Sequence, residues 1–182
     1  MITKDERISL YINEENKRVG YCRNIGISEA KGEYIGFIDN DDYVDLDFYE
    51  RLYDAAKVYD ADVAMGEIQI FDVAANQVSL ERKYQFGCEY LMPKIINKLQ
   101  EGVAWDKIYR NSFLKQNKDV RFPENVILGE DNLFVFKVMC KCNKLIFTPG
   151  SYYHWCRRMS SAGLSEKYSI MRTESSYKVL KH

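Results

Sequence analysis

The chain has 182 residues and a formal net charge of −1, with 46% apolar and 29% charged residues. That length supplies one domain with a buried core. The balanced charge excludes the strong positive field expected of a protein that binds nucleic acid or an anionic membrane. No apolar run approaches the roughly 18–20 residues of a membrane-spanning helix. The polar opening MITKDERISLYINEENKR lacks the apolar stretch of a secretory signal, so the five cysteines indicate reduced thiols in the cytoplasm.

The N-terminal part of the chain combines helical and strand patterns. Residues 7–13 (RISLYIN) alternate weakly and predict a short strand. Residues 16–31 carry apolar side chains at helical spacing and are followed by Gly32, which predicts a helix that ends at a glycine C-cap. Residues 34–38 (YIGFI) are apolar, aromatic and β-branched, which is typical of a buried strand.

The rest of the chain continues this alternation. Helical patterns lie at residues 47–60, 89–100, 111–116 and 130–142. Strand patterns lie at residues 61–71, 77–84, 103–109, 144–148 and 152–156. Strands that alternate with helices predict a layered α/β domain.

An acidic turn follows the predicted strand at residues 34–38. Asp39, Asp41 and Asp42 come directly after its last apolar residue. Neighbouring carboxylates raise each other's pKa unless a cation balances them, and Mg²⁺ or Mn²⁺ prefers such hard oxygen ligands. In open α/β sheets, ligands bind beyond the carboxyl ends of the strands. The turn is therefore a candidate metal and diphosphate site, with a solvated acidic turn as the alternative for this short motif taken alone.

The same stretch imitates a calcium-binding loop. From Asp39 to Glu50, acidic residues fall at loop positions 1, 3, 7, 9 and 12. The position that requires glycine is Val44, position 5 is Tyr43, and the preceding element is a predicted strand, not a helix. These departures exclude an EF-hand.

Residues 20–42 (GYCRNIGISEAKGEYIGFIDNDD) resemble the A-R-N-x-G-x-x-x-A-x-G-E-Y-I-x-F-x-D-x-D-D pattern of family 2 glycosyltransferases, with Cys22 in place of the usual alanine. Further segments are similar to those of capsule and lipopolysaccharide transferases in this family. They are WDKIYR at 105–110, RFPE at 121–124, GEDNLF at 129–134 and YYHWCRR at 152–158 followed by Ser160 and Ser161. The resemblance covers residues 16–161 of one predicted domain of residues 1–182, with 162–182 as a C-terminal helical extension.

The resemblance implies a GT-A fold, a three-layer α/β/α domain that is incomplete at its N-terminus. It implies inverting, metal-dependent transfer of a sugar from a nucleotide-sugar, such as a UDP-sugar, to a hydroxyl of a surface polysaccharide or lipid-linked glycan. The expected partners are that donor and acceptor, with no nucleic acid. The expected location is the cytoplasm, and a homodimer or a peripheral contact with the inner membrane face stays open.

The motifs assign roles to individual residues by resemblance. The aspartate of the family's E-D pair corresponds to Asp131, which would take the proton from the acceptor hydroxyl as a general base. A helix N-terminus favours the ionised carboxylate, which suits that role. The metal ligands would be Asp41 and Asp39, holding Mg²⁺ or Mn²⁺. The expected nucleotide-sugar-binding residues are Arg23, Asn24, Asp39, Arg158 and Ser160, and the expected acceptor or sugar contacts are Trp105 and Glu130.

Several of these residues have a structural alternative. Glu130 and Asp131 could serve only to complement the dipole of the helix that they begin. Arg23 could lie on a helix surface, and Trp105 could fill the core. Arg158, with Ser160, could close over a diphosphate, because arginine makes bidentate contacts with phosphate.

Two segments typical of the family are not found in this sequence. Family members begin with a strand of the V-S-V-I-I-P-x-Y-N type and a second strand that ends in a D-D-G-S turn, and these hold the base and ribose. Their absence predicts a sheet with an exposed apolar edge, in either a truncated protein or one whose sheet is completed by a partner. The alternative function is therefore a catalytically inactive GT-A remnant that acts as a binding or scaffold module.

Overall fold

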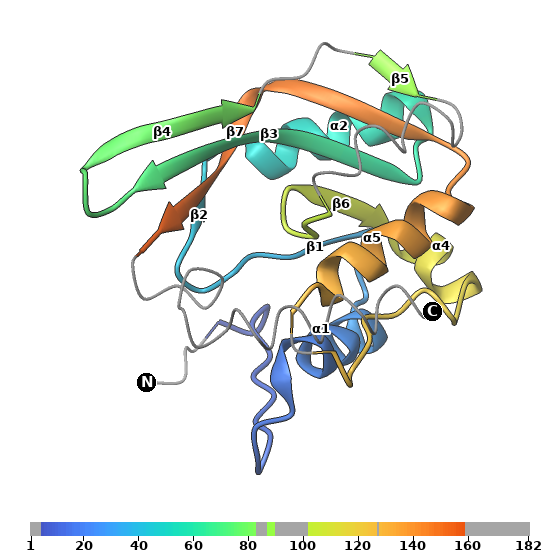
Figure 1. The fold of residues 1–182 in the computed structure, drawn as a ribbon. Coiled ribbons are helices and arrows are strands. Elements are labelled where there is room, and N and C mark those ends of the chain that lie inside the picture. Colours follow the sequence, from blue (N-terminus) through green and yellow to red (C-terminus); the bar gives the residue numbers. More distant parts are fainter. Residues whose placement is uncertain (1–4, 83–86, 90–101, 127, 159–182) are drawn as a thin grey trace.

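The computed structural model describes residues 5–82, 87–89, 102–126 and 128–158 (Figure 1). The helices are α1 (Arg18–Glu29), α2 (Phe48–Tyr59), α4 (Asn111–Gln116) and α5 (Glu130–Lys141). The strands are β1 (Tyr34–Gly36), β2 (Tyr43–Val44), β3 (Val63–Asp72), β4 (Gln77–Arg82), β5 (Gly87–Glu89), β6 (Lys107–Arg110) and β7 (Leu145–Arg157). Within these ranges, no helix has the length and apolar character needed to cross a membrane.

The described strands form one mixed sheet with the order β1-β6-β3-β7-β2, while β4 pairs with β3 and β5 pairs with β7. β3 and β7 run parallel, and the other pairs are antiparallel. β7 joins the two strands predicted at 144–148 and 152–156 into one. Its pairing with β3 shifts register between Met65 and Glu67, opposite Gly150, whose φ of 90° is a backbone conformation suited to glycine. The Pro149-Gly150 pair therefore makes a bulge where the sequence indicated a break.

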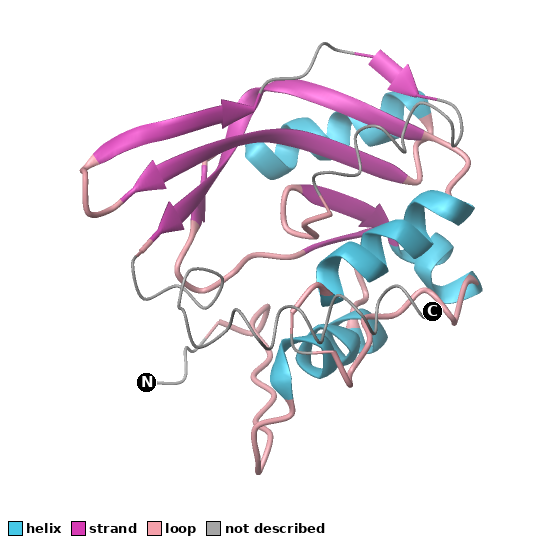
Figure 2. Cartoon of the chain, in the orientation of Figure 1, coloured by secondary structure: helices cyan, strands magenta, loops and turns pink. Residues whose placement is uncertain are grey.

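Helices cover both faces of the sheet (Figure 2). Successive residues of a strand point to opposite faces. On one face, the Phe48 ring of α2 lies so close to Gly66 of β3 that a Cβ there would be only 2.4 Å from it. On the other face, Phe37 after β1 packs against Phe134 of α5. β3 is buried from Val63 through Ile68 because both of its faces are covered. This confirms the predicted layered α/β arrangement.

An aromatic cluster fastens the end of β1 to the start of α5. The rings of Phe122 and Phe134 stack with centroids 3.9 Å apart, and Phe37 meets Phe134 edge-on at 6.0 Å. Tyr109 of β6 closes the cluster at 5.3 Å from Phe134 and 5.8 Å from Phe37. All four side chains are buried, at 0–8% exposure. The acidic turn after β1 and the first turn of α5 are therefore held on one side of the molecule.

Two N-terminal predictions are wrong. Residues 7–13 form no strand, and Ile8, Leu10 and Ile12 are 59–80% exposed, because no described strand lies beside them to accept their backbone hydrogen bonds. The first helix does not end at a glycine C-cap. It ends at Glu29, and Ala30 leaves it in an extended conformation with φ −62° and ψ 129°.

Predictions in the middle of the chain have mixed outcomes. The strand predicted at 61–71 and the helices predicted at 47–60, 111–116 and 130–142 are confirmed by β3, α2, α4 and α5. The strand predicted at 77–84 is present as β4 through Arg82. The helix predicted at 89–100 is wrong at Glu89, which belongs to β5, and its other residues lie outside the described ranges. The extended segment predicted at 103–109 is a strand only from Lys107. The extension at 162–182 also lies outside the described residues.

β1 lies at one end of the order formed by the described strands. A groove of about 440 Å³ runs beside it, lined mainly by Tyr34, Ile38, Tyr49 and Tyr53. Ile38 is 52% exposed there. This edge of the described sheet is therefore apolar, as predicted.

The aromatic cluster generates a stability prediction. Phe134→Ala should lower the free energy of unfolding by about 3–5 kcal/mol, because a fully buried ring is lost and leaves a cavity. Phe136→Ala on the same helix is the matched control, since Phe136 is 47% exposed and should cost far less. Urea unfolding followed by circular dichroism measures both. Equal losses in the two variants would contradict the assignment of this cluster as the core.

Candidate active site

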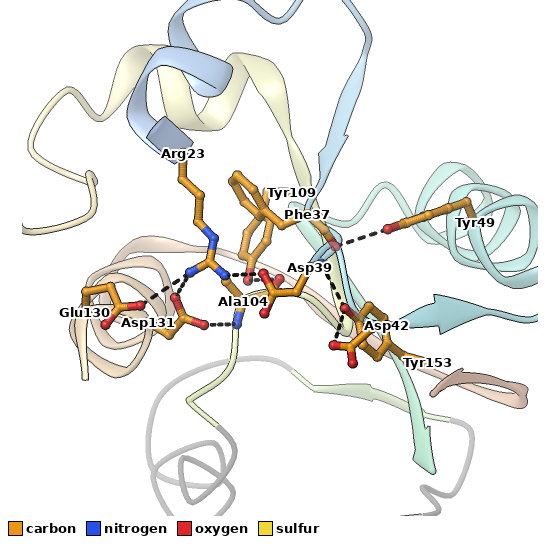
Figure 3. A network of polar contacts seen from close by, with 10 residues as sticks. All are labelled: Arg23, Phe37, Asp39, Asp42, Tyr49, Ala104, Tyr109, Glu130, Asp131 and Tyr153. Atoms are coloured by element: carbon orange, nitrogen blue, oxygen red, sulfur yellow. Dashed lines mark hydrogen bonds and ion pairs between the residues drawn. The ribbon is translucent and has the colours of Figure 1, made fainter. Parts of the chain in front are cut away.

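The acidic turn after β1 is anchored from β7. The Tyr153 hydroxyl accepts a hydrogen bond from the Asp39 backbone N–H at 3.1 Å and donates one to Asp42 Oδ2 at 2.9 Å (Figure 3). The other oxygen of Asp42 accepts the backbone N–H of Cys156 at 2.9 Å. Asp42 is therefore a structural anchor of the turn. Tyr153 was not among the predicted site residues, although it lies within the YYHWCRR segment that resembles the family.

The two other aspartates of the turn keep accessible carboxylates. Asp39 accepts a hydrogen bond from Arg23 at 2.7 Å, and its side chain is 36% exposed. Asp41 accepts one from Arg158 at 3.1 Å, and its side chain is 46% exposed. The turn thus presents two carboxylates, each beside an arginine, at the carboxyl end of β1.

The first turn of α5 presents a second pair of carboxylates. Gly129 precedes the helix with a φ of 87°, a left-handed conformation that favours glycine, and Glu130 and Asp131 follow. The side chains of Glu130 and Asp131 are only 13% and 18% exposed. Asp131 Oδ2 accepts the backbone N–H of Ala104 at 3.3 Å. The segment before β6 therefore fixes the orientation of the Asp131 carboxylate.

Arg23 joins Asp39 of the turn to Glu130 and Asp131 of α5, as Figure 3 shows. One terminal nitrogen of its guanidinium donates to Asp131 and lies 3.6 Å from Glu130, while the other donates to Asp39 at 2.7 Å. The guanidinium also lies 5.3 Å from the centroid of the Phe122 ring. The side chain is only 10% exposed, which excludes the alternative of a residue on a helix surface.

Burial changes the protonation of this site. Burial, and then the neighbouring charge of Asp131, raise the pKa of Glu130 to about 7, with Arg23 acting in the opposite direction. Burial also raises the pKa of Asp131, and the Arg23 charge offsets part of that rise. Desolvation of the Asp131 carboxylate outweighs the favourable charges around it, so the helix N-terminus by itself does not set its pKa.

The remaining predicted residues lie in different surroundings. The Asn24 amide donates to the Phe122 carbonyl at 2.9 Å and accepts the Phe122 N–H at 2.9 Å, so it ties α1 to the loop beneath Arg23. Trp105 is 5% exposed and stacks on Tyr153 with ring centroids 4.1 Å apart, which places its ring in the core. Ser160 lies outside the described residues.

Within the described residues, the acidic turn offers few ligands for a metal ion. Over the described ranges, no three His, Cys, Asp or Glu side chains are grouped to hold a metal ion by themselves. Asp39 and Asp41 are two hard oxygen donors on one exposed turn. Mg²⁺ is usually held by one or two carboxylates together with substrate phosphates. The donor set therefore fits a metal ion whose coordination is completed by a diphosphate.

The family described as Glycosyl transferase family 2 has a sequence model that matches residues 1–122, more than half of this chain. The match includes residues 1–15, which precede the stretch of resemblance predicted from motifs.

Among curated proteins, the chain is similar to the poly(ribitol-phosphate) β-N-acetylglucosaminyltransferase TarS of Staphylococcus aureus, with 32% identity over 163 residues, 84% of this chain and 27% of the relative. It is 29% identical to the glycosyltransferase GlyA of Streptococcus pneumoniae, over 86% of this chain and 23% of the relative. It is 27% identical to the cholesterol galactosyltransferase of Borreliella burgdorferi, over 87% of this chain and 47% of the relative. The chain thus spans 23–47% of the length of these relatives.

Solved structures give the same result for the fold. The chain aligns with S. aureus TarS 1–349 in complex with UDP at a TM-score of 0.66 and 23% identity, over 88% of this chain and 42% of the other. It aligns with the complex of the same protein with UDP-GlcNAc at a TM-score of 0.63 and 25% identity, over 86% and 46%. This likeness confirms the predicted α/β fold of the GT-A type.

The raised pKa of Glu130 generates a prediction about stability and pH. A carboxyl that has a pKa near 4.5 when unfolded and about 7 when folded binds more protons in the folded state between those values. Its contribution to stability is present below about pH 4.5 and is lost as the pH rises through about 7. Glu130→Gln should therefore raise the free energy of unfolding above pH 7 by at most about 3 kcal/mol, and should change it little in acid.

Urea unfolding as a function of pH measures this difference. Glu14→Gln is the matched control, because Glu14 is exposed in the N-terminal segment. A constant difference between the Glu130→Gln variant and the wild type at all pH values would contradict a raised pKa for Glu130.

Proposed function

We propose, on the premise that the chain belongs to glycosyl transferase family 2, that it carries the site of an enzyme that moves a sugar from a nucleotide-sugar to a hydroxyl group of a cell-surface glycan. The observation that carries this proposal is the arrangement of carboxylates in one site. Asp39 and Asp41 lie on the exposed turn after β1, and Asp131 lies across from them at the start of α5, joined to Asp39 through Arg23. Such a site offers a place for a donor diphosphate and a base for an acceptor.

On the donor side, Asp41 and Asp39 would hold Mg²⁺ or Mn²⁺ together with the diphosphate. When bound, the metal ion supplies positive charge that stabilises the diphosphate as it leaves. Arg158, 3.1 Å from Asp41, would contact the same diphosphate, because its guanidinium suits bidentate contact with phosphate. The complexes of TarS with UDP and UDP-GlcNAc support a UDP-sugar as the donor.

On the acceptor side, Asp131 would act as the general base. The acceptor oxygen forms a bond with the anomeric carbon while the bond from that carbon to the diphosphate oxygen breaks. The electron pair of the broken bond leaves with the nucleoside diphosphate, and the acceptor proton passes to Asp131. Attack from the face opposite the leaving group inverts the anomeric configuration. The raised pKa of Asp131 supports this role, since a base works best when its pKa approaches the pH at which it operates.

The acceptor class follows from the relatives. The names of TarS and the Borreliella enzyme specify a poly(ribitol-phosphate) and cholesterol as acceptors. We therefore propose a hydroxyl of a surface polysaccharide or lipid-linked glycan for this chain. A cytoplasmic location, with contact at the inner face of the membrane, suits a nucleotide-sugar donor and such an acceptor.

Titration calorimetry with UDP tests the donor site, in the presence and absence of Mn²⁺. We expect micromolar binding by the wild type that depends on the metal ion. Asp41→Ala should weaken the metal-dependent binding by roughly tenfold or more, about 1.4 kcal/mol or above, without loss of the fold. Asp54→Ala on the exposed face of α2 is the control.

A wild type that binds no UDP even at millimolar concentration would favour a binding or scaffold module. An Asp41→Ala variant that unfolds would show that Asp41 is structural.

Asp131→Asn tests the base. The amide keeps the size of the side chain but cannot take a proton, so kcat for sugar transfer should fall by roughly 10²–10⁴-fold. Affinity for UDP should stay within a few-fold, because Asp39 and Asp41 are unchanged. Asp54→Asn is the control for a surface amide substitution. A variant with near-normal kcat would assign the base to another group, and a parallel loss of UDP affinity would place Asp131 in the nucleotide site instead.

A further inference from the structure

One guanidinium contacts both halves of the site. Arg23 donates to Asp39 on the donor side and to Asp131 on the acceptor side, and its 10% exposure leaves it little contact with water. The Phe122 ring lies against its guanidinium, and Asn24 fixes the Phe122 backbone to α1. Arg23 is thus held against Phe122, with its N–H groups divided between the two carboxylates.

We infer that Arg23 is a positioning residue that couples donor binding to the release of the base. This inference rests on the proposed function. Without donor, Arg23 is shared between Asp39 and Asp131. When the donor diphosphate binds beside Asp39, it takes the guanidinium from Asp131, because a diphosphate is a stronger partner for a guanidinium than one carboxylate.

The contacts of Asp131 explain why this release matters. One of its oxygens accepts from Arg23, and the other accepts from Ala104 N–H. While Arg23 stays in place, its charge opposes the transfer of a proton to Asp131. Its departure increases the proton affinity of Asp131 at the time when a donor is present to react. The base is therefore strengthened only in the complex that can use it.

Other charged and titratable groups also face Asp131. Any test has to distinguish their effects on the protonation of Asp131 from the effect of Arg23. They are Glu130 on α5, Asp39 after β1, and Lys107 and Tyr109 on β6. A bound diphosphate also raises the pKa of nearby carboxylates directly through its negative charge. The contribution of Arg23 has to be isolated by a double-mutant cycle.

The experiment measures the protons taken up when UDP-GlcNAc binds in the presence of Mn²⁺. Calorimetry in buffers with different ionisation enthalpies gives this number across the acidic to neutral pH range. The four proteins are the wild type, Arg23→Gln, Asp131→Asn and the double variant. The proton uptake linked to Asp131 is the uptake of a protein that has Asp131 minus the uptake of the matching protein with Asp131→Asn. It is obtained once in the wild-type background and once in the Arg23→Gln background, and Asp54→Asn is the control substitution.

At acidic pH we expect wild-type binding to take up a fraction of a proton that is lost in Asp131→Asn. This uptake should decrease as the pH rises, because Asp131 has to stay ionised in the complex at the pH of transfer. In the Arg23→Gln background, the uptake linked to Asp131 should fall by half or more, because no cation is left to withdraw. Equal uptake in both backgrounds would overturn the inference, since the diphosphate would then act directly on Asp131. The absence of any uptake linked to Asp131 would overturn it as well, since Arg23 would then stay with its carboxylate.

Arg23→Lys covers the case in which Arg23→Gln does not fold. A lysine ammonium is a compact charge that cannot span both carboxylates as the fork of a guanidinium does, so it should also reduce the linked uptake by half or more. An uptake in Arg23→Lys equal to that of the wild type would overturn the inference. A wild type that binds no UDP-GlcNAc would overturn the proposed function and this inference with it. Binding without the expected uptake pattern would overturn the inference alone.

Discussion

Asp39, Glu130 and Asp131 surround the guanidinium of Arg23, and the organisation of the site depends on this shared ion pair. Glu130 and Asp131 have little exposure to water and are costly to ionise, and they share the single charge of Arg23 with the more exposed Asp39. Burial therefore raises the pKa of Glu130 to about 7 and raises that of Asp131 as well. Carboxyl groups with raised pKa values are candidates for proton transfer.

The carboxylates can meet only because the fold brings two distant segments together. The stacked rings of Phe122 and Phe134, with Phe37 against them, pack the end of β1 onto the start of α5. Tyr153 fixes the acidic turn from the other side, because its hydroxyl accepts a hydrogen bond from the Asp39 N–H and donates one to Asp42. Both oxygens of Asp42 already accept hydrogen bonds within the protein, so Asp39 and Asp41 are the aspartates of the turn that are available to a ligand. Apolar packing thus determines the position of the polar groups in the site.

In the proposed function, donor and acceptor chemistry would share one small site, and the same scaffold supplies two different surroundings for them. The exposed turn after β1 suits a diphosphate with a metal ion, while the largely buried start of α5 suits proton transfer. Burial differs between the two carboxylate groups because the turn lies at the rim of the sheet, whereas α5 covers its face. Arg23 comes from a third element, α1, which contributes the compensating charge that neither of the other two elements supplies.

The sequence by itself determined the features that depend on local spacing. These are the amphipathic helix α2, the buried strand β3, the apolar helix α5 and the position of an acidic turn directly after β1. The family motif also pointed to Asp39, Asp41 and Asp131. The tertiary structure alone decided that Arg23 lies between Asp39 and Asp131, because that contact joins residues 108 positions apart. It also decided that residues 7–13 are not a strand and that Asp131 is harder to ionise than its helix position suggests. A strand requires a neighbouring strand, and a pKa depends on what covers the carboxyl, and neither is encoded in the spacing of residues along the chain.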